Sequence, residues 1–355
     1  MGTLLIPGPV KLTDEIRLAQ AGDMISHRGK PFEELHMAII ENLRKNFDAE
    51  EAYVFTGSGT LGVETVIVNA ANRNEKMLCL ANGDFGRRFA ETARVYTNVI
   101  EEKMPEGKGW NLERAKEKID NAQSAGATVF GMVYNDTSVG LTNHTGEICR
   151  YAKSKGMFTA VDAVSAWGGV PLSVRKDGID FVCTGSQKAI GAPPGLSMIA
   201  VGKDGIERYT KNAVASYYCD LKKHKKFMDK KQTPYTPAVS LFYALRTALE
   251  LMEKNGGIEK NIARHAAGAK YTREQLVSLG FELLAENGYE SNTVTAFRSD
   301  KCDEIKKRLM AEHQVEIAGG MGELKGKILR IAHIGNFTMG ELETGISAMR
   351  KVLGK

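Results

Sequence analysis

Residues 180–189, DFVCTGSQKA, place a lysine directly after an apolar segment. The run at 181–183 is typical of a buried strand, and the small residues that follow it end the strand. The next residues, 189–195 (AIGAPPG), carry no charge, and their two prolines prevent a helix. Lys188 is therefore expected on an irregular segment at the end of a buried strand, where a charge is costly unless it has a function. The alternative is a structural lysine whose ammonium group reaches solvent.

Apolar runs followed by polar residues recur along the N-terminal part of the chain, and amphipathic helical patterns alternate with them. The runs lie at 53–55, 77–80, 98–101, 128–134, 158–161, 181–183 and 196–201. Helices are expected at 14–20 and 31–47, from 61 onward, and at 85–96, 112–122 and 146–155. This alternation predicts a mostly parallel sheet covered on both faces, with a ligand site beyond the carboxyl ends of its strands. The polar residues expected at those ends are Ser58, Asn82, Thr137, Asp162 and Lys188.

The C-terminal part is expected to form a smaller α+β domain. The sequence predicts helices at 238–254, from 257 to about 279, at 303–313 and at 340–353, and strands at 281–284, 294–298, 315–317 and 328–334. We therefore predict a large domain over residues 13–256 and a small one over 257–355. Residues 1–12 are expected to be an extended arm that packs on the small domain or on a partner subunit, because Pro7 and Pro9 oppose a helix.

Composition narrows the class of protein. The net charge of +5 is mild, and the one dense basic run, 222–231, is expected to be a solvated, mobile loop, so nucleic-acid binding is not predicted. The five cysteines are scattered, which predicts neither a metal site nor a disulfide framework and favours a reducing cytoplasm. Neither a signal peptide nor a membrane span is predicted.

The glycine-rich segment 56–60, TGSGT, joins a predicted strand to a predicted helix. The glycines let a ligand approach the backbone, and the free N–H groups of a first helical turn bind anions, so a phosphate site is one interpretation. A tight turn capped by Ser58 is the other. The spacing matches neither the P-loop nor the dinucleotide fingerprint.

Asp162 lies at a strand end, where a buried carboxylate needs a cation or several hydrogen-bond donors. It could cap a helix, or it could pair with a protonated ring nitrogen. A lysine, a buried aspartate and a phosphate loop at one sheet edge are the set that pyridoxal phosphate requires. The lysine bonds to its aldehyde, the aspartate keeps its ring nitrogen charged and the helix N-terminus holds its phosphate.

The chain resembles the class-V aminotransferases of fold type I, and is most similar to the alanine–glyoxylate and serine–pyruvate aminotransferases. The resemblance runs almost the whole length. It rests on residues 7–9 (PGP), 57–60 (GSGT), 82–86 (NGDFG), 161–165 (VDAVS), 185–189 (GSQKA), 192–195 (APPG), 236–241 (TPAVSL) and 329–331 (LRI). It implies a large domain with a mostly parallel seven-stranded sheet covered by helices, and a smaller α+β C-terminal domain.

The resemblance also implies roles for individual residues. Lys188 would form the Schiff base with pyridoxal phosphate and carry the proton, Asp162 would pair with the ring nitrogen, and Val164 and Phe85 would cover the two ring faces. Thr137 would bond near the ring oxygen. The phosphate would be held by Ser58, Gly59, Thr60 and Gln187.

The family pattern implies a homodimer in which Thr236 reaches the phosphate of the partner subunit. A tyrosine that some relatives place three residues earlier is Thr233 here, and Tyr235 is a candidate replacement. The site would contain no metal.

A role for Arg330 can be inferred from the sequence directly. On the predicted strand it shares a face with Ile328 and Ala332, so its guanidinium needs an anion. That anion could be an internal carboxylate; the resemblance implies instead the α-carboxylate of the substrate, with Gly8 also lining the substrate site.

The expected function is ping-pong transamination from alanine or serine to glyoxylate or pyruvate, because no second arginine is evident for a distal carboxylate. Aspartate or an aminophosphonate is the first alternative, with a cation supplied by the basic run of a partner subunit. A lyase or cysteine desulfurase is less favoured, because Phe85 replaces the usual histidine and Cys302 is predicted to begin a helix. A non-catalytic member of the fold, or a basic binding protein using 222–231, is opposed by the presence of Lys188, Asp162 and Arg330.

Overall fold

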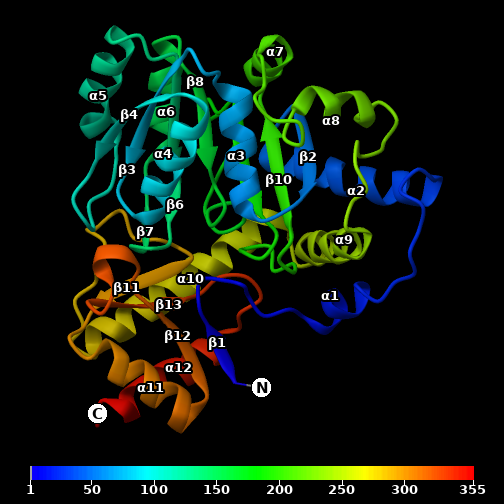
Figure 1. Ribbon diagram of the computed structural model, residues 1–355. Coiled ribbons are helices and arrows are strands. Elements are labelled where there is room, and N and C mark those ends of the chain that lie inside the picture. The colour runs from blue at the N-terminus through cyan, green and yellow to red at the C-terminus, as the bar shows by residue number, and fades with distance from the viewer. Residues whose placement is uncertain (1) are drawn as a thin grey trace.

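The computed structural model describes residues 2–355 and contains a larger and a smaller sheet (Figure 1). The larger sheet has seven strands in the order β2-β10-β9-β8-β5-β3-β4. β10 is antiparallel to both neighbours, and the other strands share one direction, as predicted. The strands are β2 (Glu51–Thr56), β3 (Lys76–Ala81), β4 (Asn98–Lys103), β5 (Val129–Val133), β8 (Phe158–Asp162), β9 (Phe181–Gly185) and β10 (Leu196–Val201).

Helices cover both faces of the larger sheet because its strands are apolar on both sides. In β9, Val182 packs in one hydrophobic cluster, while Phe181 and Cys183 pack in the other. The first face is covered by α2 (Lys30–Phe47), α5 (Leu112–Ser124), α6 (Thr145–Ser154) and α9 (Val239–Lys254). The second is covered by α3 (Gly59–Ala70), α4 (Asp84–Tyr96) and α7 (Lys203–Lys211).

The smaller sheet joins the two ends of the chain. Its order is β1-β12-β13-β11, and β1 (Thr3–Leu5) is parallel to β12 (Val315–Gly319). β13 (Ile328–Ala332) is antiparallel to both β12 and β11 (Val294–Arg298). The N-terminal arm is therefore an edge strand of the smaller sheet. The chain then passes through a short helix, α1 (Asp14–Ala19), which Thr13 caps.

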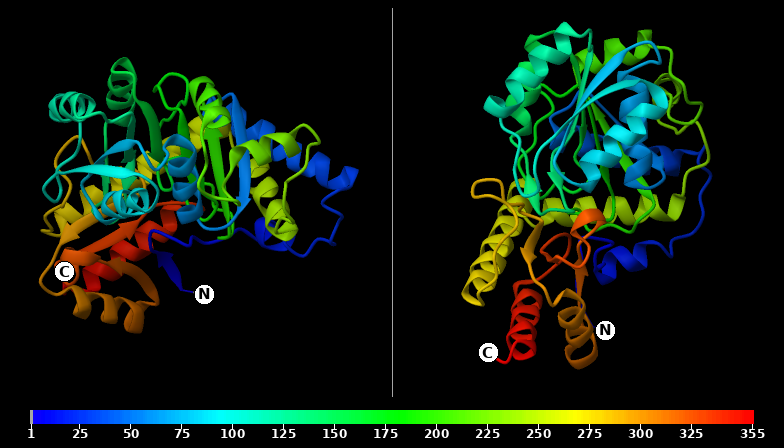
Figure 2. Two further views of the ribbon diagram at one scale, coloured as in Figure 1. Left: turned by 45° about the horizontal axis from the view of Figure 1, so that its top comes forward. Right: turned by 60° about the vertical axis from the view of Figure 1, so that its left-hand side comes forward.

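The two faces of the smaller sheet have different neighbours. Leu329 and Ile331 face a cluster that contains residues of α10 (Gly257–Ser278), α11 (Cys302–His313) and α12 (Met339–Val352). Ile328 on the opposite face packs with Val139 and Leu141, beside the hairpin of β6 (Asn135–Asp136) and β7 (Leu141–Thr142). α11 and α12 lie on the side away from the larger sheet (Figure 2). The face of the smaller sheet that carries Arg330 is thus turned toward the larger sheet.

The prediction of a mobile loop at 222–231 is wrong for most of that run. Leu221–Met228 form helix α8, which begins where the Asp220 side chain accepts a hydrogen bond from the backbone N–H of Lys222. Leu221 and His224 are buried on its inner face, and Lys225 pairs with Glu51. The lysines of this run lie on the outer face of an amphipathic helix. Buried side chains on successive turns are enough to hold such a short helix against the core.

Two strand predictions in the C-terminal part also differ from the structure. Residues 281–284 form no strand: Leu283 makes a single bridge to Phe297, and the chain then turns so that Glu286 reaches Arg114. The predicted strand at 328–334 ends at Ala332, before the left-handed Gly335. A 3₁₀ turn, Gly322–Leu324, connects β12 to β13. Between residues 2 and 355, none of the helices is both long and apolar enough to cross a membrane.

Candidate active site

The carboxyl ends of the central strands enclose a cavity of about 170 Å³. It is lined by the loop after β2, the start of α4, and the segments that follow β5, β8 and β9. All the residues predicted to contact the cofactor within one chain meet here: Ser58, Gly59, Thr60, Phe85, Thr137, Asp162, Val164, Gln187 and Lys188. The structure thus brings together side chains that lie up to 130 residues apart, from Ser58 to Lys188.

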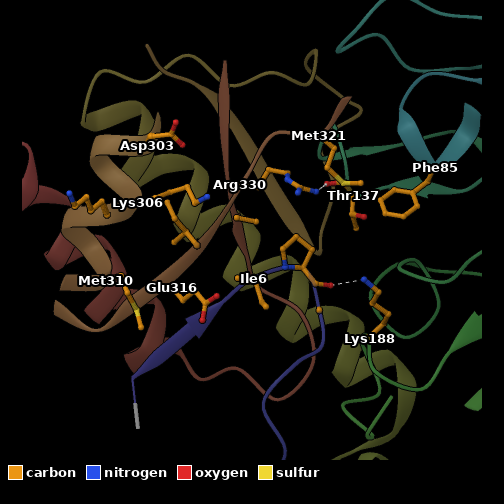
Figure 3. A pocket seen from close by; sticks show the side chains of 15 residues that line it. Ile6, Phe85, Thr137, Lys188, Asp303, Lys306, Met310, Glu316, Met321 and Arg330 are labelled. Carbon is orange, nitrogen blue, oxygen red and sulfur yellow. Dashed lines mark hydrogen bonds between the residues drawn. The ribbon is translucent and has the colours of Figure 1, made fainter. Parts of the chain in front are cut away.

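A second cavity, of about 710 Å³, shares Phe85, Thr137 and Lys188 with the first and opens toward the smaller sheet. Arg330 and Gly8, the two predicted substrate-binding residues, line it. In Figure 3, Lys188 and Phe85 stand on one side of this cavity, and the residues of β12, β13 and α11 stand on the other. The two cavities are therefore neighbours, separated by side chains that line both.

Two of the polar residues singled out by the sequence lie elsewhere. Thr236 is exposed and lines neither cavity. Asn82 is buried but donates hydrogen bonds to Asn143 and to the carbonyl of Lys108, so it supports the loops behind the site.

Lys188, three residues after the end of β9, lines both cavities. Its ammonium nitrogen donates a 2.7 Å hydrogen bond to the carbonyl oxygen of Pro7. Burial lowers the pKa of Lys188 to about 8; the charge of Asp162 opposes this shift, and the charges of Arg330 and Arg88 add to it. A substantial fraction of this amine is therefore neutral, and so nucleophilic, near physiological pH.

Asp162 ends β8 and is 4 % exposed. One carboxylate oxygen accepts a 2.8 Å hydrogen bond from the Val164 backbone N–H, and the other is left for a ligand. Burial raises the pKa of Asp162 to about 6, although the Val164 hydrogen bond and the charge of Arg88 lower it. A cation in this cavity would be strongly favoured beside such a carboxylate.

Helix α3 begins at the edge of the same cavity. Ser58 is its N-cap, but the Ser58 side chain makes no capping hydrogen bond, so its hydroxyl and the first N–H groups of the helix are free to bind an anion. Gly59 allows Val164 to approach, because a Cβ atom at Gly59 would lie 2.9 Å from a Val164 methyl carbon. Gln187 completes this end of the cavity, and its side-chain oxygen is buried without a hydrogen-bond partner.

Arg330 is 6 % exposed on the inner face of the smaller sheet. Its Nε donates to the carbonyl of Gly319 and its Nη1 to the carbonyl of Thr137, both at 2.8 Å. Arg330 forms no ion pair with any residue from 2 to 355, so the internal carboxylate considered from the sequence is not found. The Nη2 end of the guanidinium is left for an anion in the cavity.

Several residues that line the smaller cavity were not predicted. Arg88 lies one turn after Phe85 on α4, with its guanidinium carbon 4.6 Å from the centre of the Phe85 ring. Its spacing from Phe85 was a usable signal, since residues three apart on a helix share a face. Asn135 and Ser165 also line this cavity, and the Asn135 amide donates a 2.8 Å hydrogen bond to the Ser165 hydroxyl. Ser165 belongs to the 161–165 motif, but no role was predicted for either residue.

Comparison with known proteins places the chain in a family. Residues 15–324 match the model of the class-V aminotransferases. An uncharacterized aminotransferase of Methanocaldococcus jannaschii is 38% identical, over 94% of this chain and 87% of that one. The serine–glyoxylate aminotransferase of Methylorubrum extorquens is 27% identical, over 94% and 86% of the two chains. The crystal structure of an alanine–glyoxylate aminotransferase from Nostoc superposes with a TM-score of 0.93 at 28% identity, over 99% of this chain and 95% of that one. This chain therefore belongs to the class-V aminotransferases, enzymes of fold type I that depend on pyridoxal phosphate.

Proposed function

We propose that this aminotransferase moves the amino group of a small amino acid, alanine or serine, to a small 2-oxo acid, glyoxylate or pyruvate, in two half-reactions at one site. One observation carries the proposal: the unpaired guanidinium of Arg330 and the partly neutral amine of Lys188 line the same cavity. Such a pair suits a molecule that bears a carboxylate next to a reacting carbon. The names of the Methylorubrum and Nostoc relatives support the choice of small substrates.

The residues present fit pyridoxal phosphate. The free hydroxyl of Ser58 and the N-terminus of α3 offer hydrogen-bond donors to a phosphate at the end of the cavity where Gln187 lies, and Asp162 offers a buried carboxylate to a protonated ring nitrogen. Val164 and Phe85 line the cavity between these two groups and provide apolar surface for the ring. When bound, this cofactor supplies an aldehyde and a ring that withdraws electrons from the substrate's α-carbon.

Lys188 has two roles in the proposal. Its Nζ would hold the cofactor aldehyde, and as a free amine it would accept and return the proton of the substrate's α-carbon. A pKa of about 8 suits both roles, because the amine can gain and lose a proton readily near neutral pH. The hydrogen bond to the Pro7 carbonyl gives the released amine a defined place beside the substrate cavity.

Arg330 orients the substrate in this scheme. The carbonyls of Gly319 and Thr137 fix two edges of the guanidinium, so its remaining donors can bind the α-carboxylate without rearrangement. Gly8 lines the same cavity close to Lys188 and leaves room for the substrate. We further propose a homodimer in which the exposed Thr236 contributes to the partner's phosphate site.

A desulfurase reaction is weakly supported. Cys302 is buried at the start of α11, and its thiol donates to the carbonyl of Ser299. Burial raises the pKa of this thiol, which opposes a reactive thiolate.

The test is a panel of half-reactions. Purified enzyme loaded with pyridoxal phosphate is mixed with one amino acid at a time, and loss of the cofactor's visible absorption band is followed; the aminated enzyme is then mixed with single 2-oxo acids. We expect alanine or serine to remove the absorption band, and glyoxylate or pyruvate to restore it. Lys188→Ala should abolish both steps, whereas Lys203→Ala, at the exposed start of α7, should not. Absence of amino exchange with every small substrate would refute the proposal.

A further inference from the structure

Lys306 of α11 and Arg330 of β13 lie on the same wall of the larger cavity, opposite Lys188 and Phe85 (Figure 3). Gly319 connects them. Its carbonyl accepts the hydrogen bond from Arg330 Nε at 2.8 Å, and a Cβ atom built on it would lie 3.5 Å from Lys306 Nζ. Both cations therefore lie beside Gly319.

Lys306 is half-buried, and its ammonium group pairs with no carboxylate among residues 2–355. Elsewhere on α11, Arg308 pairs with Glu312. A half-buried lysine and a buried arginine that line one cavity and form no ion pair among residues 2–355 would both be stabilised by an anionic ligand.

Two carboxylates also line this cavity, Asp303 and Glu316, and neither forms an ion pair within residues 2–355. Glu316 lies two residues before Ala318, which is the register partner of Arg330, so it is displaced from Arg330 by roughly 7 Å along β12. Asp303 precedes Lys306 by about one turn of α11. Against these two charges the same wall carries three cations, Lys306, Lys307 and Arg330, which leaves it net positive.

We infer that Lys306 binds the distal carboxylate of a dicarboxylic substrate while Arg330 binds its α-carboxylate. The inference rests on the proposed transamination and widens its substrate class: one of the two half-reactions takes an acidic amino acid, which leaves as the 2-oxo dicarboxylic acid after its nitrogen has passed to the cofactor. The cation comes from the same chain, so the basic run at 222–231 of a partner subunit is not needed for this role.

Equilibrium binding tests the inference without turnover. Succinate and butyrate differ only in a distal carboxylate, and the cofactor-loaded enzyme can be titrated with each by calorimetry. We expect succinate to bind about 10- to 100-fold more tightly, the contribution of one charge-assisted hydrogen bond. Lys306→Met should bring the two affinities together, and Lys306→Arg should keep most of the difference.

Lys301→Met is the matched control, since it removes the same charge from an exposed position at the start of the same helix that does not line the cavity. The preference for succinate should survive it. An equal loss in both variants would show a general effect of charge and would overturn the inference, as would a wild-type enzyme that does not distinguish succinate from butyrate.

Kinetics separate this inference from the proposed function. For Lys306→Met we expect kcat/KM for aspartate or glutamate to fall about 10- to 100-fold and kcat/KM for alanine to stay within about twofold. If alanine or serine reacts but succinate binds no better than butyrate, only the inference fails. If no amino acid reacts while Lys306 still governs succinate binding, the proposed function fails and the second carboxylate site stands.

Discussion

Lys188 Nζ donates a hydrogen bond to the carbonyl oxygen of Pro7, a residue 181 positions earlier in the chain. Pro7 lies just after β1, the strand that joins the N-terminal arm to the smaller sheet. The lysine at the end of β9 is therefore linked through the arm to the sheet that carries Arg330. The next residue, Gly8, has a φ of +138°, and a Cβ atom there would lie 2.9 Å from Lys188 Nζ.

Gly8→Ala should impair the enzyme without unfolding it. The methyl group would crowd Lys188 Nζ, and an L-residue at this φ is strained by ~1–2 kcal/mol. We expect kcat/KM to fall at least about 10-fold. Gly126→Ala is the control, because Gly126 also has a positive φ but open space around it, so this variant should lose stability and keep its activity. Normal turnover in Gly8→Ala would mean that the arm moves away from Lys188 during catalysis.

The rate at which the apoenzyme binds pyridoxal phosphate should depend on pH, with a midpoint near pH 8. The neutral amine of Lys188 reacts with the aldehyde, and burial lowers its pKa to about 8, so the rate at which apoenzyme takes up pyridoxal phosphate should rise as pH increases through that value. In Arg330→Gln the midpoint should move upward, because the nearby positive charge that lowers the Lys188 pKa is lost. A wild-type rate that continues to climb toward pH 10 would contradict the assignment.

Asp162→Asn should lower turnover without lowering the stability of the apoprotein. Burial raises the pKa of Asp162 to about 6, so the folded apoprotein binds more protons than the unfolded chain between about pH 4 and 6, and its stability falls as pH rises through that window. Asparagine keeps the acceptor for the Val164 N–H and removes the buried charge. At pH 8 we therefore expect an equal or higher Tm for the variant apoprotein.

The same Asp162→Asn variant should lose at least about 100-fold in kcat, since the proposed partner of the ring nitrogen is gone. Calorimetric unfolding and single-turnover rates measure the two effects. A less stable apoprotein with unchanged turnover would show that Asp162 is a structural cap of the turn after β8.

Arg330→Ala should act on substrate binding rather than on cofactor binding. Loss of the guanidinium should lower kcat/KM for alanine about 100- to 1,000-fold, mainly through KM, while the affinity for pyridoxal phosphate changes little. Arg330→Lys should restore part of the loss, because a lysine keeps the charge but not the two-point geometry. If KM stays constant while Tm falls, the role of Arg330 is to hold the Gly319 and Thr137 carbonyls together.

Thr236 can be tested by mixing subunits. Thr236→Asp would place a negative charge near the partner's phosphate site and should abolish activity, as Lys188→Ala does. If Thr236 acts across a dimer, hybrids of the two inactive variants contain one site with an intact Lys188 and an intact Thr236. Re-formed mixtures should then regain up to about a quarter of the wild-type activity, given random pairing. Hybrids that stay inactive would show that Thr236 does not act across a dimer.

The sequence alone predicted most of the strands and helices of the larger sheet and the sheet edge at which the cavity lies. The apolar runs that precede Ser58, Asp162 and Lys188 indicate strands that are buried on both faces. Strands of this kind form parallel sheets, in which the carboxyl ends lie along one edge. That rule uses only local patterns and chain direction. It was therefore enough to bring a lysine, an aspartate and a helix N-terminus into one cavity.

Tertiary structure alone decided which partners those residues meet. The Pro7 carbonyl at Lys188, the Gly319 and Thr137 carbonyls at Arg330, and the position of Lys306 beside Gly319 all depend on how the smaller sheet packs against the larger one. Side-chain periodicity records whether a residue is buried, but not which distant backbone group faces it. The same limit explains why 222–231 was expected to be a loop: its charges lie on the outer face of α8, and the core that holds Leu221 comes from elsewhere in the chain.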